Sequence, residues 1–239
     1  MSEQNRQKLR VRDVAMRFAE LAARKPDSFE PKPGVLHVVP TPIGHLGDLG
    51  LRSGMMLANA DLVLCEDTRV TKSLYSLLGI SPPRLERFDA SREHSEKLND
   101  VLQQLKNGAV VVLVSDAGMP GVSDPGSFLV RACHEQGIEV CGVAGPSALP
   151  LAIALSGGQA SESRFLGFFP RDKSARQELA TRIRSESEAA QWIWHESPER
   201  ILASAKFFAA EFPDFRLILC KELTKQYERN FSGTARDVA

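Results

Sequence analysis

The densest group of residues that can approach a ligand closely lies at 109–126, AVVVLVSDAGMPGVSDPG. Its first half is an apolar run typical of a buried strand in a parallel sheet. Its second half is rich in glycine, proline and aspartate, which is typical of a tight turn after such a strand. Ligands of open α/β sheets bind beyond the carboxyl ends of the strands, and small residues let the backbone approach them. Residues 115–120 are therefore the first candidate site; a tight turn that binds nothing is the alternative.

Five further polar loops follow expected strands in the same way. They are PTPIGHLGD at 40–48, EDTR at 66–69, AGPSA at 144–148, HESPE at 195–199 and KELTK at 221–225. Parallel strands bring such loops to one edge of a sheet, so we expect them to converge. None contains a P-loop, a dinucleotide-binding glycine pattern or a nucleophile elbow. The five histidines show no metal-ligand spacing, so we expect no metal site.

Charged side chains in these loops are candidates for acid–base chemistry. Asp67 can accept a proton or orient a hydroxyl, and Arg69 can hold a phosphate. The alternative, left open, is that both cap and brace the following helix. His94 titrates near neutral pH and is a third candidate, although on a charged helix a solvated histidine is more common. Further carboxylates near the expected cleft are Glu66, Glu196 and Glu222.

Strands and helices alternate along the core, and this predicts an α/β fold of right-handed βαβ units with a mainly parallel sheet. Strands are expected at 36–39, 61–65, 84–89, 109–114, 138–143, 164–169, 190–194 and 216–220. Helices are expected at 51–59, 91–106, 127–136, 171–184 and 201–211, with another through Leu74, Leu77 and Leu78. We expect an N-terminal arm at 1–33 and two α/β domains, at 34–148 and 149–239.

Two stretches carry basic helices. In the arm, Val14, Phe18 and Leu21 fall at helical spacing among many arginines, so the helix can bind RNA or a partner subunit; a packed or frayed terminal arm is the alternative. The second stretch includes the expected helix at 171–184 and offers the best basic surface for RNA phosphates. The alternative is that this charged helix face is simply solvated. The cations of this stretch are Arg164, Arg171, Lys173, Arg176, Arg182 and Arg184.

The composition is that of an ordinary globular chain, with 239 residues, 43% hydrophobic residues and a formal net charge of zero. Any nucleic-acid contact must therefore come from a local basic patch. Four scattered cysteines and the lack of a CxxC pair favour a reducing cytoplasm over disulfides or zinc. We expect no secretory signal and no membrane span.

Taken in order, VVPTPIGHLGD, ADLVLCEDTR, VSDAGMPGVSDPG, AGPSA, HESPER and KELTK resemble the tetrapyrrole methylase-like (class III) methyltransferases, over about 35–237. Within them the chain looks most like the branch that methylates the ribose 2′-hydroxyl of a cytidine in 16S ribosomal RNA. The resemblance implies S-adenosylmethionine in a cleft between two α/β domains, a homodimer, and small-subunit ribosomal RNA or a ribosomal particle as partner. The cofactor residues that it implies are Pro42, Ile43, Gly44, Ala117, Gly118, Met119, Val122, Ser147, Ala148, Glu196 and Leu223.

The chain departs from the family pattern at several positions. Met119 stands where the family has threonine, His45 where it has asparagine, and Glu199 where it has histidine. The long arm is extra, and the closing strand expected after KELTK is missing. Two rival functions remain: a methyltransferase for a small, tetrapyrrole-like molecule, and a non-catalytic RNA- or ribosome-binding relative.

Overall fold

The computed structural model describes residues 10–88, 96–123, 126–158, 160–186 and 190–239. The chain forms two compact units. The first comprises Met1–Pro42 and Leu46–Pro146, and the second comprises Ile43–His45 and Ser147–Ala239. The division of the chain falls two residues before the expected boundary at 148, and a short piece of the loop at 40–48 belongs to the second unit.

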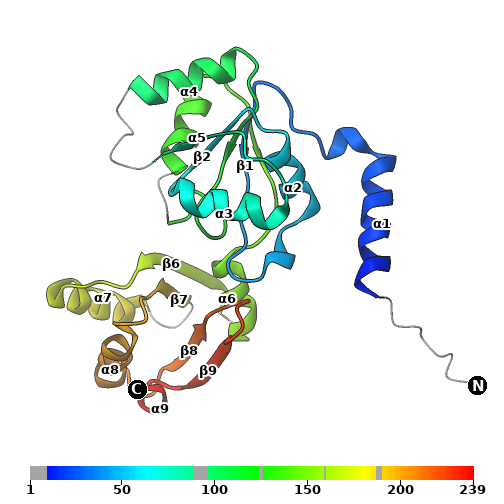
Figure 1. Cartoon of the computed structure of the whole chain (residues 1–239). Coiled ribbons are helices and arrows are strands. Elements are labelled where there is room, and N and C mark those ends of the chain that lie inside the picture. The colour runs from blue at the N-terminus through cyan, green and yellow to red at the C-terminus, as the bar shows by residue number, and fades with distance from the viewer. Residues whose placement is uncertain (1–9, 89–95, 124–125, 159, 187–189) are drawn as a thin grey trace, which may run out of the picture. The chain divides into compact units, whose positions relative to one another are not determined.

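The first unit is built on a five-stranded, all-parallel sheet in the order β3-β2-β4-β1-β5. Figure 1 labels two of its strands, β1 and β2. Its strands are β1 (Leu36–Val38), β2 (Leu62–Cys65), β3 (Arg84–Arg87), β4 (Val111–Leu113) and β5 (Val140–Gly142). The connecting helices are α2 (Leu51–Ala58), α3 (Thr68–Leu78), α4 (Glu96–Lys106) and α5 (Gly126–Glu135), with a short 3-10 turn at Leu46–Asp48. The expected α/β class is confirmed, and residues 91–95 of the expected fourth helix lie outside the described residues.

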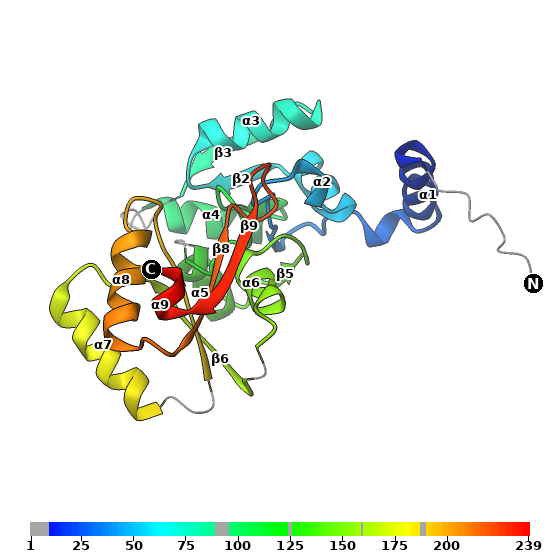
Figure 2. The same ribbon diagram turned by 90° about the horizontal axis from the view of Figure 1, so that it is seen from below.

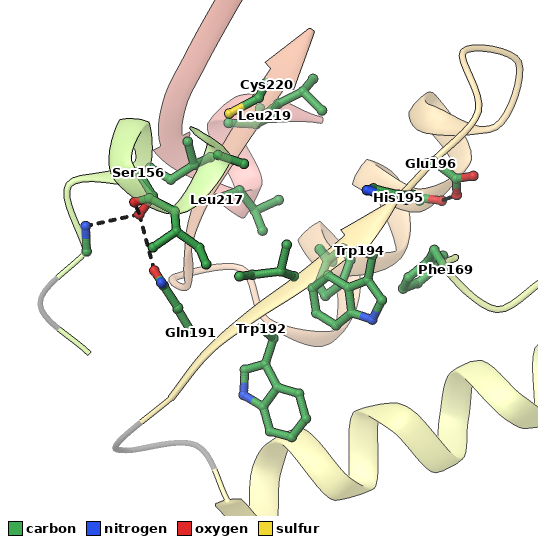
Figure 3. A pocket seen from close by; sticks show the side chains of 18 of the residues that line it. Ser156, Phe169, Gln191, Trp192, Trp194, His195, Glu196, Leu217, Leu219 and Cys220 are labelled. Carbon is green, nitrogen blue, oxygen red and sulfur yellow. Dashed lines mark hydrogen bonds between the residues drawn. The ribbon is translucent and has the colours of Figure 1, made fainter. Parts of the chain in front are cut away.

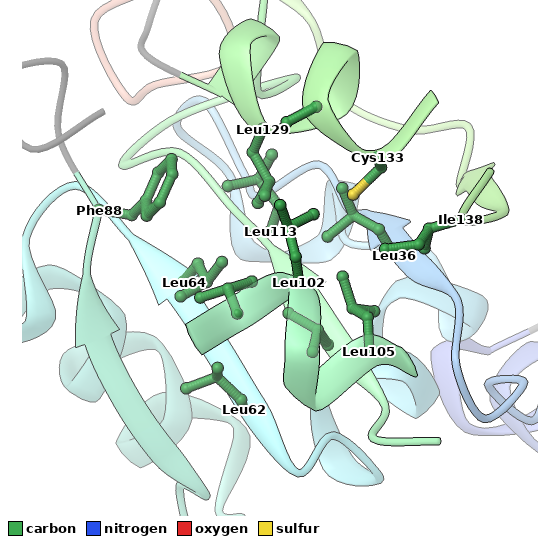
Figure 4. Packing of buried hydrophobic residues seen from close by; sticks show 13 residues of the cluster. Leu36, Leu62, Leu64, Phe88, Leu102, Leu105, Leu113, Leu129, Cys133 and Ile138 are labelled. Carbon is green, nitrogen blue, oxygen red and sulfur yellow. The ribbon is translucent and has the colours of Figure 1, made fainter. Parts of the chain in front are cut away.

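Both faces of this sheet are buried, which explains its nearly continuous runs of Val and Leu. Leu64 and Leu113 point to one face, where Leu105 of α4 and Leu129 of α5 cover them (Figure 4). The other face packs against α2 and α3, and its buried residues include Val63, Val112, Met56 and Tyr75. Successive side chains along β2 and β4 point to opposite faces of the sheet, so each strand contributes residues to both cores.

Strand order places the loop after β4 at the centre of the carboxyl edge. The chain leaves β1 and β2 toward the face of α2 and α3, but it leaves β4 toward α5 on the opposite face. Because β4 lies between β1 and β2, its outgoing loop is flanked by two connections that turn the other way. Such a switch point is where open α/β sheets bind ligands.

The second unit contains two separate pairs of strands. β6 (Glu162–Phe168) is parallel to β7 (Ala190–His195), and β8 (Arg216–Lys221) is antiparallel to β9 (Arg229–Thr234). Its helices are α6 (Ala148–Ser156), α7 (Lys173–Glu186), α8 (Ile201–Glu211) and α9 (Ala235–Val238), and α7 lies beside α8 in both views (Figures 1 and 2). An aromatic cluster around Phe169 and Phe208 forms its core.

The N-terminal arm forms helix α1 (Val11–Arg24), followed by a 3-10 turn at Pro26–Ser28. None of the α1 residues is buried, and Phe18 and Leu21 are both more than half exposed. The expected helix is therefore confirmed, but none of the described residues buries its apolar face. Among the described residues, no helix is long and apolar enough to cross a membrane.

Candidate functional site

The loop after β4 is held in one conformation by hydrogen bonds to the loop after β1. Thr41 and Gly118 exchange two backbone hydrogen bonds, both 3.0 Å long. The buried hydroxyl of Thr41 donates to Ser115 O at 3.0 Å, and the buried hydroxyl of Ser115 donates to Gly118 O at 3.1 Å. Gly118 has a φ of 89°, a left-handed conformation that glycine adopts without a steric penalty. This network fixes the backbone of Ala117 and Met119.

Three acidic residues join the loops after β2 and β4. Asp67 N donates to Asp116 Oδ1 at 3.1 Å, and Asp116 N donates to Glu66 Oε1 at the same distance. The expected convergence of these two loops is confirmed, and Asp116, which the sequence pattern does not single out, is the residue that links them. Pro42 and Val122, also expected to contact cofactor, belong to the same unit and are partly exposed.

Asp67 is the N-cap of α3. Its Oδ1 accepts the Arg69 backbone N–H at 2.8 Å, and its two oxygens accept the Arg69 guanidinium at 2.6–3.2 Å. These bonds from Arg69 lower the pKa of Asp67 to about 2. So low a pKa makes Asp67 a weak base at neutral pH, although it can still orient a hydroxyl. The structure therefore favours the capping and bracing role, while the Arg69 side chain stays 89% exposed.

Replacing Asp67 with asparagine tests this assignment. A carboxyl whose pKa falls from 3.8 to about 2 on folding stabilises the folded state above 3.8, and that contribution is lost as the pH falls toward 2. We expect the melting-temperature difference between wild type and Asp67→Asn to be constant above about pH 5 and to shrink below it. A difference that stays constant down to pH 3 would contradict the pairing. The measurement is thermal unfolding followed by circular dichroism across pH.

Gly44 and the loop after β8 form a second cradle, within the second unit. A Cβ on Gly44 would lie 2.6 Å from Lys225 Cγ, 2.7 Å from Thr224 Oγ1 and 2.9 Å from Leu223 O. His45 N also donates to Thr224 Oγ1 at 3.1 Å. The expected cofactor residues Gly44 and Leu223 are therefore neighbours, although far apart in sequence. Ile43 and Ser147 are half-buried in the same unit, and Ser147 is the N-cap of α6.

We expect Gly44→Ala to destabilise the second unit by about 1–2 kcal/mol, since a methyl group must displace the chain at 223–225. Gly50→Ala is the matched control, because a Cβ there meets only Ser53 Oγ, at 4.0 Å. Urea unfolding of both variants provides the measurement. Equal stability of the two variants would show that the cradle tolerates a side chain at position 44.

A cavity of about 760 Å³ lies in the second unit, a volume within the range of small-molecule sites (Figure 3). Three residues expected to bind cofactor line it: Ala148, Glu196 and Leu223. Ser156 and Gln191 lie at one side, joined by a 3.2 Å hydrogen bond. Consecutive residues at 190–196 and 215–220 also line it, so the cavity follows the edges of β7 and β8. It therefore extends beyond the three expected cofactor residues.

Glu196 is almost fully buried, with 8% of its side chain exposed. It forms an ion pair with Arg200 at 2.5 Å, accepts Ser197 N at 2.7 Å and accepts the hydroxyl of Ser204. The carboxylate thus holds the loop after β7 against α8. Burial lowers the pKa of the neighbouring His195, which packs edge-on against Phe165 and Phe168.

The basic helix α7 is largely compensated within its own unit. Arg182 pairs with Glu186 at 3.4 Å, and Arg184 pairs with Glu211 of α8. Arg164 of β6 pairs with Glu162 at 2.7 Å and also with Glu186. Arg176 donates to Pro170 O and lies over the Phe169 ring. Arg171 and Lys173 are exposed and have no ion-pair partner among the described residues.

His94 lies outside the described residues. Glu222 is partly buried beside Leu223 and has a positive φ of 52°. The described part of the chain contains no group of three or more His, Cys, Asp or Glu side chains arranged to hold a metal ion.

Comparison with known proteins identifies what this chain resembles. The family model described as "Tetrapyrrole (Corrin/Porphyrin) Methylases" matches residues 35–239. A Leptospira biflexa protein named "Ribosomal RNA small subunit methyltransferase I" is 41% identical over 202 residues, which cover 84% of this chain and 82% of that protein. A Thermotoga maritima protein of the same name is 40% identical over 200 residues, covering 84% of this chain and 88% of that protein.

Solved structures give the same fold at low identity. A diphthine synthase crystal structure matches with a TM-score of 0.62 at 16% identity, covering 85% of this chain and 83% of the other. The uroporphyrin III C-methyl transferase of Thermus thermophilus matches with a TM-score of 0.55 at 18% identity, covering 85% and 90%. These likenesses concern the fold alone. The segment matched by the family model, residues 35–239, excludes α1, so the N-terminal arm lies outside the family domain.

Proposed function

The chain belongs to the tetrapyrrole methylase family, and from that premise we propose that it is an S-adenosylmethionine-dependent methyltransferase of small-subunit ribosomal RNA. The observation that carries the proposal is the identity of about 40% with proteins named as small-subunit ribosomal RNA methyltransferases, over more than four fifths of this chain. We further propose that the acceptor is the ribose 2′-hydroxyl of a cytidine in 16S RNA. The acting form would be a cytoplasmic homodimer.

The cofactor proposal is supported by what each unit offers. In the first unit the residues around Gly118 combine a fixed backbone with the small side chain of Ala117, so a ligand can approach the main chain. In the second unit Ala148 and Leu223 line a cavity of suitable volume, and Glu196 braces its wall. We therefore propose that these residues, with Pro42, Ile43, Gly44, Met119, Val122 and Ser147, hold S-adenosylmethionine.

S-adenosylmethionine supplies a methyl group on a positively charged sulfur, which is already a good leaving group. The residues of this chain then have mainly to position the acceptor oxygen, and positioning alone can supply a large part of a rate enhancement. Loops fixed by buried hydrogen bonds suit that task, as those of Thr41 and Ser115 do. Arg69, exposed yet oriented by Asp67, is our candidate for a phosphate contact.

A ribose hydroxyl is a weak acid, so a base would assist its departing proton. The low pKa of Asp67 leaves it an orienting role in our proposal. His94 and Glu222 stay as candidates for the base. A substitution series at these positions, read as the pH dependence of kcat, distinguishes a base from an orienting group: loss of a base removes the acid limb of the profile.

The test is methyl transfer from labelled S-adenosylmethionine to small ribosomal subunits from cells that lack the gene. We expect label in the ribosomal RNA and none in subunits that already carry the modification. Cofactor binding without transfer to subunits or free RNA would favour a small-molecule methyltransferase. RNA binding without cofactor binding would instead favour a non-catalytic relative, and either outcome would overturn the proposal.

A further inference from the structure

The β8–β9 hairpin carries three exposed cations, and its connecting loop also carries the carboxylates of Glu222 and Glu228. Lys221 ends β8, Lys225 lies in the connecting loop and Arg229 begins β9, and all three are exposed. No ion pair joins any of them to a carboxylate within the described ranges, whereas Arg164, Arg182 and Arg184 near α7 all have carboxylate partners. A phosphate gains most from a cation that has no competing partner. Arg171 and Lys173, at the N-terminal end of α7, are also exposed and without an ion-pair partner among the described residues, so the hairpin is a further anion surface of the second unit.

Register places two of these cations side by side. Lys221 and Arg229 are directly opposite each other in the antiparallel pair of β8 and β9, so their side chains share one face of the hairpin. Like charges directly opposite are destabilising in a sheet, and no carboxylate of the described residues forms an ion pair with either side chain. An anion seated between the two side chains would remove that repulsion. The arrangement thus favours a bound phosphate.

Exposed aromatic rings lie beside the cations. Tyr227, in the connecting loop, is 68% exposed, and Phe231 of β9 is 44% exposed. Phe231 is opposite Leu219, one step along the same face from the pair formed by Lys221 and Arg229. An exposed ring has a free face on which a nucleobase can stack, whatever the base. Cations interleaved with aromatic rings are the pattern of single-strand binding surfaces.

The loop that presents Tyr227 is exposed, and hydrogen bonds within it hold an unusual backbone conformation. Glu222 and Thr224 both adopt positive φ angles, 52° and 62°, which non-glycine residues seldom do. Hydrogen bonds hold them: Thr224 N donates to Glu228 Oε2 at 2.6 Å, and Lys225 N donates to Glu222 O at 2.9 Å. The same loop carries Leu223, which lines the cavity. A strand bound along the hairpin would therefore lead toward residues assigned to the cofactor.

We propose that the β8–β9 hairpin, through Lys221, Lys225, Tyr227, Arg229 and Phe231, binds the single-stranded RNA that flanks the target nucleotide. Its cations contact phosphates and its rings stack on unpaired bases. The inference rests on the proposed function and extends it by naming the form of RNA and the surface that takes it. An unpaired strand is the form whose bases are free to stack on protein rings.

The test measures binding of a short fluorescein-labelled single-stranded RNA by anisotropy at several salt concentrations. We expect Tyr227→Ala to weaken binding about fivefold or more and Tyr227→Phe to retain it, because stacking needs the ring rather than the hydroxyl. Lys221→Gln and Arg229→Gln should each reduce the slope of log K against log salt by about 0.7. Arg182→Gln on α7 is the matched control and should leave the slope unchanged.

Three outcomes would overturn the inference: unchanged affinity for Tyr227→Ala, equal affinity for the single strand and its duplex, or a slope reduced only by Arg182→Gln. Circular dichroism melting of each variant excludes misfolding as the cause of any loss. The assay needs no methyl transfer. A protein that binds RNA through the hairpin but transfers no methyl group would therefore contradict the proposed function alone. A protein that transfers methyl groups, and whose Tyr227→Ala variant binds RNA with unchanged affinity, would contradict only the proposed role of the hairpin.

Discussion

Gly118→Ala is expected to lower methyl transfer by about a hundredfold, the loss associated with a displacement of about 1 Å in a positioning element. The φ of 89° at this position costs an L-residue about 1–2 kcal/mol. The residue escapes that strain by rotating toward negative φ, which breaks its two hydrogen bonds to Thr41. Ala117 and Met119 then lose the backbone positions that the proposal requires.

Calorimetry with S-adenosylmethionine and the transfer assay together measure this effect. Gly54→Ala is the control, since Gly54 lies within α2 and a Cβ there meets nothing within 4 Å. We expect the control to bind and transfer as the wild type does. Wild-type cofactor affinity in Gly118→Ala would show that the conformation of the loop after β4 does not matter for binding.

Glu196→Ala is expected to destabilise the second unit by about 3 kcal/mol or more, since removal of one partner leaves a mostly buried Arg200 charge uncompensated. It also leaves the Ser204 hydroxyl and Ser197 N–H without their acceptor. Glu196→Gln keeps an acceptor in place and should cost less. Glu199→Gln, three residues along and exposed, is the control and should change stability by less than about 0.5 kcal/mol.

Tryptophan fluorescence during urea unfolding isolates this effect. The chain has two tryptophans, Trp192 and Trp194, and both lie on β7 in the second unit. Their emission therefore reports on that unit even if the two units unfold separately. A midpoint for Glu196→Ala equal to that of the control would contradict a structural role for the ion pair.

Local sequence pattern was sufficient for most of the first unit and for part of the second. The run around Val112 and the turn at Gly118 predicted a buried strand and its outgoing loop, and both are present. Helix α8 has the bounds that its spacing indicates, Ile201–Glu211. These features depend on residues close together in sequence. Helix α6 is not predicted because Pro150 falls in its first turn. The expectation that no strand follows KELTK is wrong: β9 lies there, and its sequence, RNFSGT, is too polar to indicate a strand.

Sequence pattern does not predict contacts between segments that are distant in sequence. Arg184 pairs with Glu211, which lies 27 positions away in sequence. A count of the basic residues in α7 therefore overestimates the number of its cations that are free of a carboxylate partner. The bond between Asp67 N and Asp116 spans 49 positions and depends on the order of strands β2 and β4. Gly44 meets the loop at 223–225 only because the chain folds back across most of its length. Such partners follow from topology, which composition does not specify.

The most direct test of the central claim is to identify the methylated nucleoside itself. Small subunits lacking the modification are incubated with the protein and S-adenosylmethionine, and their 16S RNA is digested to nucleosides for mass spectrometry. We predict one new species, 2′-O-methylcytidine, whose rate of formation falls about a hundredfold with Gly118→Ala and is unchanged with Gly54→Ala. A methyl group on a base, or none in the RNA while the cofactor binds, would contradict this prediction.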